Sequence, residues 1–220
     1  MVADEIKGSP GPSDLVQVMQ LLYTLGLNTG SAGNASCRLS GKQYLITPSG
    51  IDPSALSPDS IVRMPASGAN NVGELKPSSE ANMHGAIYAA RPDVGAIVHT
   101  HSPYATALAC TRQPIPAFHY MVGVAGGDSI RCAPYATFGS EELSENAVVA
   151  LRERKACLLA NHGVLAVAAD PLAAAMLALE VEQLSMQYCI AVQSGGPVLL
   201  DGAQMKEVLE KFKTYGQISE

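Results

Sequence analysis

The segment from Val94 to His101 constrains the fold of this chain more than any other. It is apolar and rich in β-branched residues, and Pro92 and Pro103 bound it, so it predicts a β-strand. Side chains alternate between the two faces of a strand, so His99 and His101 share a face. Two imidazoles on one face provide half of a zinc site, which needs a third and usually a fourth ligand. Unless the rest of the chain supplies these ligands, the two residues are only a pair of solvated histidines at a strand end.

The composition indicates one domain that binds neither nucleic acid nor a membrane. The 220 residues carry a net charge of −6, which disfavours nucleic acid, and no uncharged apolar run is long enough to span a membrane. Residues 1–12 lack the apolar core of a signal peptide, so we expect a flexible arm before a single domain over residues 13–220. Five scattered cysteines, an odd number, are typical of the reduced thiols of a cytoplasmic protein.

Helix and strand patterns interleave along the chain, which predicts a sheet covered by helices. Helices are expected over 13–25 (with Ser13 as the N-cap), 77–90, 103–110, 140–152, 170–192 and 202–212. Strands are expected over 35–39, 44–47, 61–64, 94–101, 130–135, 156–160 and 164–168, and 118–124 fits either a strand or a loop. The apolar residues of the longest helix surround most of its circumference, so we expect them to be buried: Leu172, Met176, Leu179, Leu184 and Ile190.

His162 and Glu80 are the best candidates for the missing ligands. His162 lies in a turn after a buried strand, where the following Gly163 allows the backbone to approach a neighbour closely. Glu80 lies in the first turn of a helix that leads into the histidine strand, although it could simply stabilise the helix dipole by under ~1 kcal/mol. Three histidines and a carboxylate that can leave would form a zinc site with an openable position, as catalysis requires. His84 and His119 are weaker alternatives.

Three short turns contain residues that suit an anion. They offer hydroxyl groups, an amide and backbone N–H groups, from Gly33, Asn34, Ser49, Gly50, Ser78 and Ser79. Ser78 and Ser79 stand at a helix N-terminus, which favours phosphate, although each turn alone also fits ordinary turn chemistry. Because Ser79 adjoins Glu80, a phosphate held there would place the other end of a small substrate near the metal.

Longer segments extend these patterns and together resemble a known family. They cover 25–28, 46–51, 77–80, 99–101, 115–121, 132–139, 161–163 and 210–216. The sequence resembles the zinc-dependent class II aldolases of the L-fuculose-1-phosphate aldolase and L-ribulose-5-phosphate 4-epimerase superfamily. It is most similar to the L-fuculose-1-phosphate aldolase branch, whose terminal Phe-Lys-Thr-Tyr-Gly it shares. The resemblance implies a single α/β domain with a mostly antiparallel central β-sheet covered by helices on both faces.

The same resemblance implies roles for the candidate residues. One Zn²⁺ per subunit would be bound by His99, His101, His162 and Glu80. The phosphate of a small sugar would be held by the six turn residues, Gly33, Asn34, Ser49, Gly50, Ser78 and Ser79. The family forms a cyclic homotetramer with sites at the subunit interfaces, so further residues would reach in from a neighbour or shape the pocket. These are the catalytic Tyr120 and Tyr215, beside Glu80, and the substrate-binding Phe138 and Phe212.

The implied reaction is the reversible cleavage of a ketose 1-phosphate, such as L-fuculose 1-phosphate, to dihydroxyacetone phosphate and a small aldehyde, such as L-lactaldehyde. Zinc would stabilise the enediolate as a Lewis acid, while Glu80 would transfer the proton at carbon and Tyr120 the proton of the carbon-4 oxygen. The alternatives are a pentulose-phosphate 4-epimerase, which has a shorter acid in place of Glu80, a dehydratase of a methylthio-pentulose phosphate, and a non-catalytic scaffold. The aldehyde partner remains open.

Overall fold

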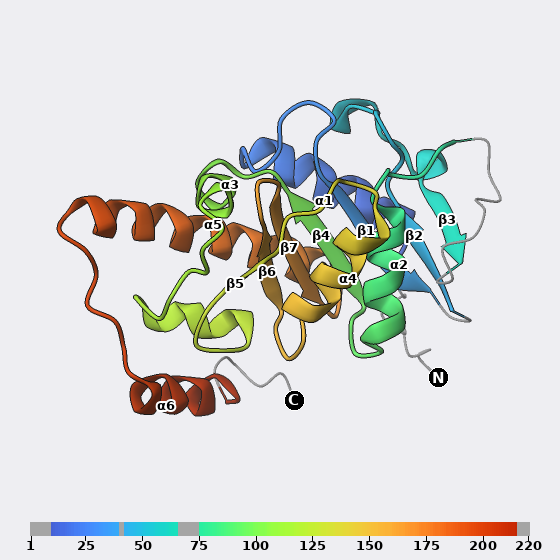
Figure 1. Cartoon of the computed structure of the whole chain (residues 1–220). Coiled ribbons are helices and arrows are strands. Elements are labelled where there is room, and N and C mark those ends of the chain that lie inside the picture. The colour runs from blue at the N-terminus through green and yellow to red at the C-terminus, as the bar shows by residue number, and fades with distance from the viewer. Residues whose placement is uncertain (1–9, 40–41, 66–74, 215–220) are drawn as a thin grey trace, which may run out of the picture.

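A seven-stranded sheet forms the centre of the computed structural model, which describes residues 10–39, 42–65 and 75–214 (Figure 1). The order of the strands is β3-β2-β1-β4-β7-β6-β5. Their bounds are β1 Asn34–Leu39, β2 Gln43–Ile46, β3 Val62–Pro65, β4 Ala96–Thr100, β5 Arg131–Ala133, β6 Ala156–Leu159 and β7 Gly163–Ala168. Neighbouring strands are antiparallel except β5 and β6, which are parallel. The predicted single α/β domain with a mostly antiparallel sheet is therefore confirmed.

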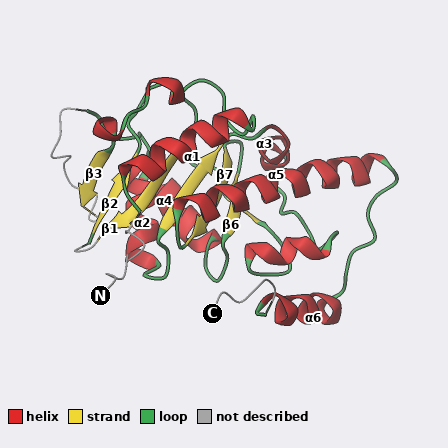
Figure 2. Cartoon of the chain, turned by 180° about the vertical axis from the view of Figure 1, so that it is seen from behind, coloured by secondary structure: helices red, strands yellow, loops and turns green. Residues whose placement is uncertain are grey.

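Helices cover both faces of the sheet, as predicted. α2 (Ala81–Ala90) and α4 (Glu141–Ala150) lie on the face seen in Figure 1, and α1 (Pro12–Thr24), α3 (Pro103–Cys110) and α5 (Pro171–Gln193) lie on the face seen in Figure 2. The side chains of β4 alternate accordingly: Ile97 packs in the α2–α4 core, while Ala96 and Val98 pack in the α1–α5 core. His99 continues the alternation and faces the α2 side.

α5 packs on the sheet through small residues, not through the large ones that the sequence suggested. Ala174, Ala175 and Ala178 are at most 1% exposed, and they let the helix axis approach the strands closely. The prediction that the whole apolar circumference is buried is wrong for Leu172, Met176 and Ile190, which are 57%, 49% and 53% exposed. Leu184 is buried and Leu179 is half-buried. Leu172 and Met176 lie on the side of the helix turned away from the buried alanines, whereas Ile190 belongs to the C-terminal part of α5, which extends past the sheet (Figure 2).

Some predicted element boundaries are also wrong. Gly11, not Ser13, is the N-cap of α1, because Pro12 occupies the first helical position and the Asp14 carboxylate accepts the Gly11 N–H (2.7 Å). The segment 118–124 is neither strand nor loop but contains most of a 3₁₀ helix, η3 (Tyr120–Ala125). Two shorter 3₁₀ helices, η1 (Pro53–Ala55) and η2 (Pro58–Ser60), lie earlier in the chain. Of the predicted arm, residues 1–9 lie outside the described residues.

α6 (Gly202–Phe212) stands apart from the sheet and packs on η3 (Figure 1). Its Val208 and Phe212 lie so close to Gly123 of η3 that a Cβ atom there would crowd the Phe212 ring. In the ranges that the structure describes, none of the helices combines the length and the apolar character that a membrane span requires.

Candidate active site

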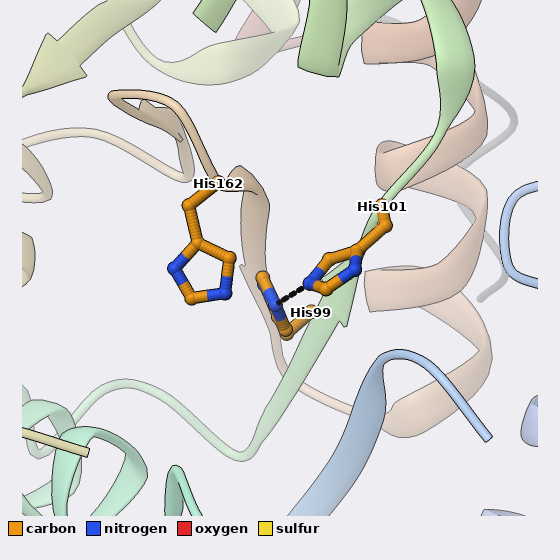
Figure 3. Close-up of side chains that lie close together, drawn as sticks. All are labelled: His99, His101 and His162. Atoms are coloured by element: carbon orange, nitrogen blue, oxygen red, sulfur yellow. Dashed lines mark hydrogen bonds between the residues drawn. The ribbon is translucent and has the colours of Figure 1, made fainter. Parts of the chain in front are cut away.

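Three of the histidines converge at one end of the sheet. His99 is a buried residue near the end of β4, His101 follows the strand directly, and His162 lies in the β6–β7 turn. β4 and β7 are antiparallel neighbours with Thr100 opposite Val164, so the turn before β7 lies beside the end of β4. Figure 3 shows the rings facing a common point, and their centroids are 4.8–5.1 Å apart. As predicted, the backbone is close here: a Cβ atom on Gly163 would collide with the Thr100 carbonyl oxygen.

The ring nitrogens of these histidines point toward one another and toward Glu80. His99 Nδ1 lies 2.8 Å from the Val164 carbonyl oxygen, which only accepts, so Nδ1 carries the proton and Nε2 is bare in the neutral ring. That Nε2 atom lies 2.9 Å from His101 Nε2 and 3.1 Å from a carboxylate oxygen of Glu80. The bare His99 Nε2 and the ionised carboxylate both only accept, so their contact is unfavourable unless a cation lies between them. The donor set therefore fits a metal ion, and the candidate ligand atoms of the three histidines all lie within 4.8 Å of one another.

Glu80 turns its side chain toward the histidines and does not cap its helix. It is the N-cap residue of α2, one position before the helical turn that the sequence suggested, and its carboxylate makes no capping hydrogen bond. Asn34 Nδ2 donates to Oε2 at 2.9 Å, and His162 Nε2 lies 3.2 Å from Oε1. Oε1 is buried and accepts no well-directed hydrogen bond from the described residues. The alternative that Glu80 only stabilises the helix dipole does not fit this geometry.

The protonation states of the cluster suit a cation. Burial raises the pKa of Glu80, but His99, His162 and the Asn34 amide outweigh burial, so the net pKa lies below its ordinary value. Burial, with the neighbouring His99 and His162, lowers the pKa of His101 to about 4, and burial lowers the pKa of His162 as well. At neutral pH the site thus offers a carboxylate at Glu80 and neutral imidazoles at His101 and His162, the forms in which these side chains bind metals.

The three anion-suited turns open into one pocket with this cluster. All six of their residues line a pocket of about 330 Å³ that Glu80, His101 and His162 also line. The Ser49 N–H donates to the Lys76 carbonyl and the Ser78 N–H to the Thr47 carbonyl, both at 3.0 Å, so two of the turns are joined to each other. The third turn is joined to the histidine strand, because Asn34 pairs with His99 across β1 and β4.

Asn28 connects the glycine turn to the histidines. Its side-chain oxygen accepts the His101 N–H at 2.9 Å, and it is 2% exposed. A Cβ atom on Gly33 would collide with this side chain, and Gly33 has a φ of +72°, which favours glycine. The turn can therefore lie against the strand end only with glycine at this position.

The remaining predicted site residues are Phe138, Tyr120, Phe212 and Tyr215, and the two alternative histidines are His84 and His119. Phe138 lines the pocket, but Tyr120 and Phe212 are not among its lining residues and stack on each other with ring centroids 6.4 Å apart. Tyr215 lies outside the described residues. His84 is buried beneath Glu80 with Nδ1 2.7 Å from Ser36 Oγ, and His119 is the N-cap of η3, so neither belongs to the histidine cluster.

Two pocket residues, Tyr135 and Asn161, were not proposed as site residues from the sequence. Tyr135 follows β5 closely, and Asn161 follows β6 in the turn of His162. β5 and β6 are parallel, so their carboxyl ends lie at the same edge of the sheet. The sequence signal that could have identified them is that both residues follow predicted strands. They become neighbours only through the parallel pairing of β5 and β6, which leaves no local sequence pattern.

Comparison with known proteins agrees with this site. Residues 13–189 match the family model described as the Class II Aldolase and Adducin N-terminal domain. A 5-methylthioribulose-1-phosphate/5-deoxyribulose-1-phosphate aldolase from Rhodospirillum rubrum is 52% identical, with 92% of this chain and 90% of that protein covered. An L-fuculose phosphate aldolase from Escherichia coli O6:H1 is 49% identical, over 87% of this chain and 89% of that protein.

Solved structures give the same result. A structure of L-fuculose 1-phosphate aldolase matches with a TM-score of 0.88 at 42% identity, covering 97% of this chain and 98% of that one. The fold and the carboxylate–histidine cluster are those of a metal-dependent carbon–carbon lyase. The chain belongs to the class II aldolase family. Its similarity to aldolases at 42–52% identity confirms the prediction of an aldolase.

Proposed function

We propose that the protein is a zinc-dependent aldolase that reversibly cleaves a ketose 1-phosphate to dihydroxyacetone phosphate and a small aldehyde. One observation carries the proposal: a single pocket joins three phosphate-suited turns to a carboxylate beside three histidines. A three-carbon phosphate held by the turns would present its carbonyl to that cluster. His99, His101 and His162, with Glu80 in the absence of substrate, would hold the ion.

Different groups of the site have different roles in the proposed reaction. Zn²⁺, when bound, supplies Lewis-acid stabilisation of the negative charge on the carbonyl oxygen. The turns bind the phosphate through N–H and hydroxyl groups, and the Asn34 amide orients the Glu80 carboxylate from 2.9 Å. Glu80 removes a proton from carbon 3 of dihydroxyacetone phosphate in condensation and returns it in cleavage. Tyr120 transfers the proton of the carbon-4 oxygen.

The substrates in the relatives' names differ only in the aldehyde half. Cleavage between carbons 3 and 4 gives dihydroxyacetone phosphate from 5-methylthioribulose, 5-deoxyribulose and L-fuculose 1-phosphates alike. The pocket wall includes the exposed aromatic side chains of Tyr135 and Phe138. These side chains suit the methyl or methylthio end of the aldehyde half. We propose these three compounds as the candidate substrates, including the L-fuculose 1-phosphate that the sequence resemblance implies.

The test is a cleavage assay of the zinc-loaded protein with all three compounds. We expect dihydroxyacetone phosphate from at least one of them, and the ratios of kcat/KM will identify the preferred aldehyde half. Loss of activity with a chelator and recovery with Zn²⁺ would support the metal assignment. If the metal-loaded protein neither cleaves these compounds nor exchanges the carbon-3 proton of dihydroxyacetone phosphate, the proposal is wrong.

We also propose a homotetramer whose sites lie between subunits. Within one chain Tyr120 and Phe212 lie on η3 and α6, outside their own pocket, and Tyr120 is 50% exposed. In such a tetramer, both aromatic residues would lie at the pocket of the neighbouring subunit and could contact its substrate.

A further inference from the structure

Arg112 connects the segments that form one wall of the pocket. It follows α3, and its guanidinium Nε donates to Asn161 Oδ1 at 2.7 Å, while its Cζ atom lies 5.7 Å from the centroid of the Tyr135 ring. The backbones of the two polar residues are joined as well, because the N–H groups of Arg112 and Asn161 both donate to the Ala109 carbonyl, at 3.0 and 3.1 Å. Both residues have positive φ angles, 57° and 54°, so two tight turns face each other.

The Arg112 contact determines the orientation of the Asn161 amide. A guanidinium group only donates, so the atom that faces it must be the amide oxygen. The Asn161 Nδ2 group is then the free end of the side chain, and no hydrogen bond from it to another described residue is present. Asn161 lines the pocket together with His101, His162 and Glu80. The pocket wall therefore offers an oriented N–H donor next to a metal-ligating histidine.

We propose that Asn161 is a specificity and binding residue that donates a hydrogen bond to the aldehyde oxygen, and that Arg112 is its positioning residue. The inference rests on the proposed aldolase function. The aldehyde oxygen is the carbon-4 hydroxyl oxygen of the ketose, and it accepts hydrogen bonds in both forms. In condensation the new bond joins carbon 3 of dihydroxyacetone phosphate to the aldehyde carbon, the carbonyl electron pair moves to this oxygen, and a proton is then added to it. Asn161 keeps its own protons throughout.

Other acceptors in the substrate fit this donor less well. The phosphate already has the three turns, which supply six residues of the same pocket. The carbonyl of dihydroxyacetone phosphate faces the carboxylate–histidine cluster. A donor on the wall beside Tyr135 is left for the half of the substrate that lies beyond carbon 3. A donor aimed at the oxygen where negative charge develops stabilises the transition state most effectively.

Asn161→Asp tests the donor while preserving the rest of the wall. Aspartate keeps the oxygen that Arg112 contacts and also tolerates the left-handed backbone conformation. It replaces the N–H group by a second oxygen and adds one negative charge, which lies beside the Arg112 guanidinium. Arg112→Lys keeps the charge but loses the directional Nε contact, and Gln113→Ala, next along the exposed turn, is the matched control. Each protein, loaded with Zn²⁺, would be assayed for metal content, for proton exchange of dihydroxyacetone phosphate alone, and for condensation with acetaldehyde and with lactaldehyde.

We expect Asn161→Asp to retain its metal, its exchange rate and its KM for dihydroxyacetone phosphate, and to lose about tenfold or more in kcat/KM for both aldehydes alike. Arg112→Lys should show a smaller loss of the same kind, and Gln113→Ala none. Unchanged condensation, an equal loss of exchange and condensation, or a loss confined to one aldehyde would overturn the inference. If the wild-type protein itself exchanges no proton, the proposed function fails instead, so the two failures are distinguishable.

Discussion

Glu80 is the residue on which the proposed chemistry depends most. Its carboxylate touches two histidines and the Asn34 amide, and one of its oxygens accepts no well-directed hydrogen bond in the described part of the chain. Glu80→Gln keeps the size and one oxygen of the side chain but removes the base. We expect the variant to retain most of its zinc on three histidines, and its exchange of the dihydroxyacetone phosphate proton to fall roughly 10²–10⁴-fold.

His101→Ala is the companion variant, because it removes a ligand instead of the base. Metal content by elemental analysis and proton exchange should both fall in this protein, whereas only exchange falls in Glu80→Gln. Undiminished exchange in Glu80→Gln would assign the base to another residue.

His84 should make stability depend on pH. Burial is the main cause that lowers its pKa to about 3 from an ordinary 6.5, and the ring is fully buried. Between these values the unfolded chain binds a proton at this position and the folded chain does not, so the free energy of unfolding decreases as the pH falls from 6.5 towards 3. The slope from one such group is at most about 1.4 kcal/mol per pH unit.

The measurement is urea unfolding of the metal-free protein across this pH range, compared with His84→Asn. The variant should show a shallower pH dependence, since other titrating groups contribute equally to both proteins. An NMR titration of the wild-type ring gives a second readout that needs no variant. A ring that becomes protonated near pH 6.5 in the folded protein would contradict the prediction.

At the scale of elements, Glu182 joins two helices of the α1–α3–α5 face. It lies on α5, is 6% exposed, and its two carboxylate oxygens accept the N–H groups of Tyr104 and Ala105 at 2.9 Å each. These are free donors at the N-terminus of α3, where a negative charge is favourable. Because α3 carries the turn with Arg112, the contact also supports the pocket wall.

Glu182→Gln should lower the free energy of unfolding by about 1.5–3 kcal/mol, since it weakens two charge-assisted hydrogen bonds in a buried position. Glu180→Gln, on the same helix but without a hydrogen bond from another described residue, serves as the control and should be close to neutral. Chemical denaturation of both variants provides the measurement. Equal stability of the two variants would show that the capping contact contributes little.

At the scale of the whole molecule, a site shared between subunits can be tested by mixing inactive variants. Glu80→Gln lacks the base, and Tyr120→Ala lacks an aromatic residue that lies outside its own pocket. If Tyr120 serves a neighbour's site, subunits exchanged between the two proteins will form some sites with both groups intact. Mixed samples should then recover cleavage activity that neither variant has alone, and light scattering should give a tetrameric mass. Active monomers, or no recovery despite proven subunit exchange, would contradict the shared site.

Local sequence patterns were sufficient to identify most of the pocket. The two-residue spacing placed His99 and His101 on one face, and the turns of Gly33, Ser49 and Ser78 could be recognised directly as suited to an anion. They were sufficient because strand alternation and turn chemistry depend on a few neighbouring residues. The same patterns misjudged α5, because they count apolar residues and cannot show which side of the helix meets the sheet or where the sheet ends.

The sequence by itself determined which groups are available: three histidines, a carboxylate and three anion-suited turns. The tertiary structure alone decided which of them meet. His162 lies beside His99, 63 positions earlier in the chain, because β4 and β7 pair antiparallel. Arg112 contacts Asn161, 49 positions later, because α3 ends beside the β6–β7 turn. Pairing between distant strands is selected by burial of the whole sheet between two layers of helices. No local segment encodes it, so the Asn161 donor became visible only in the folded chain.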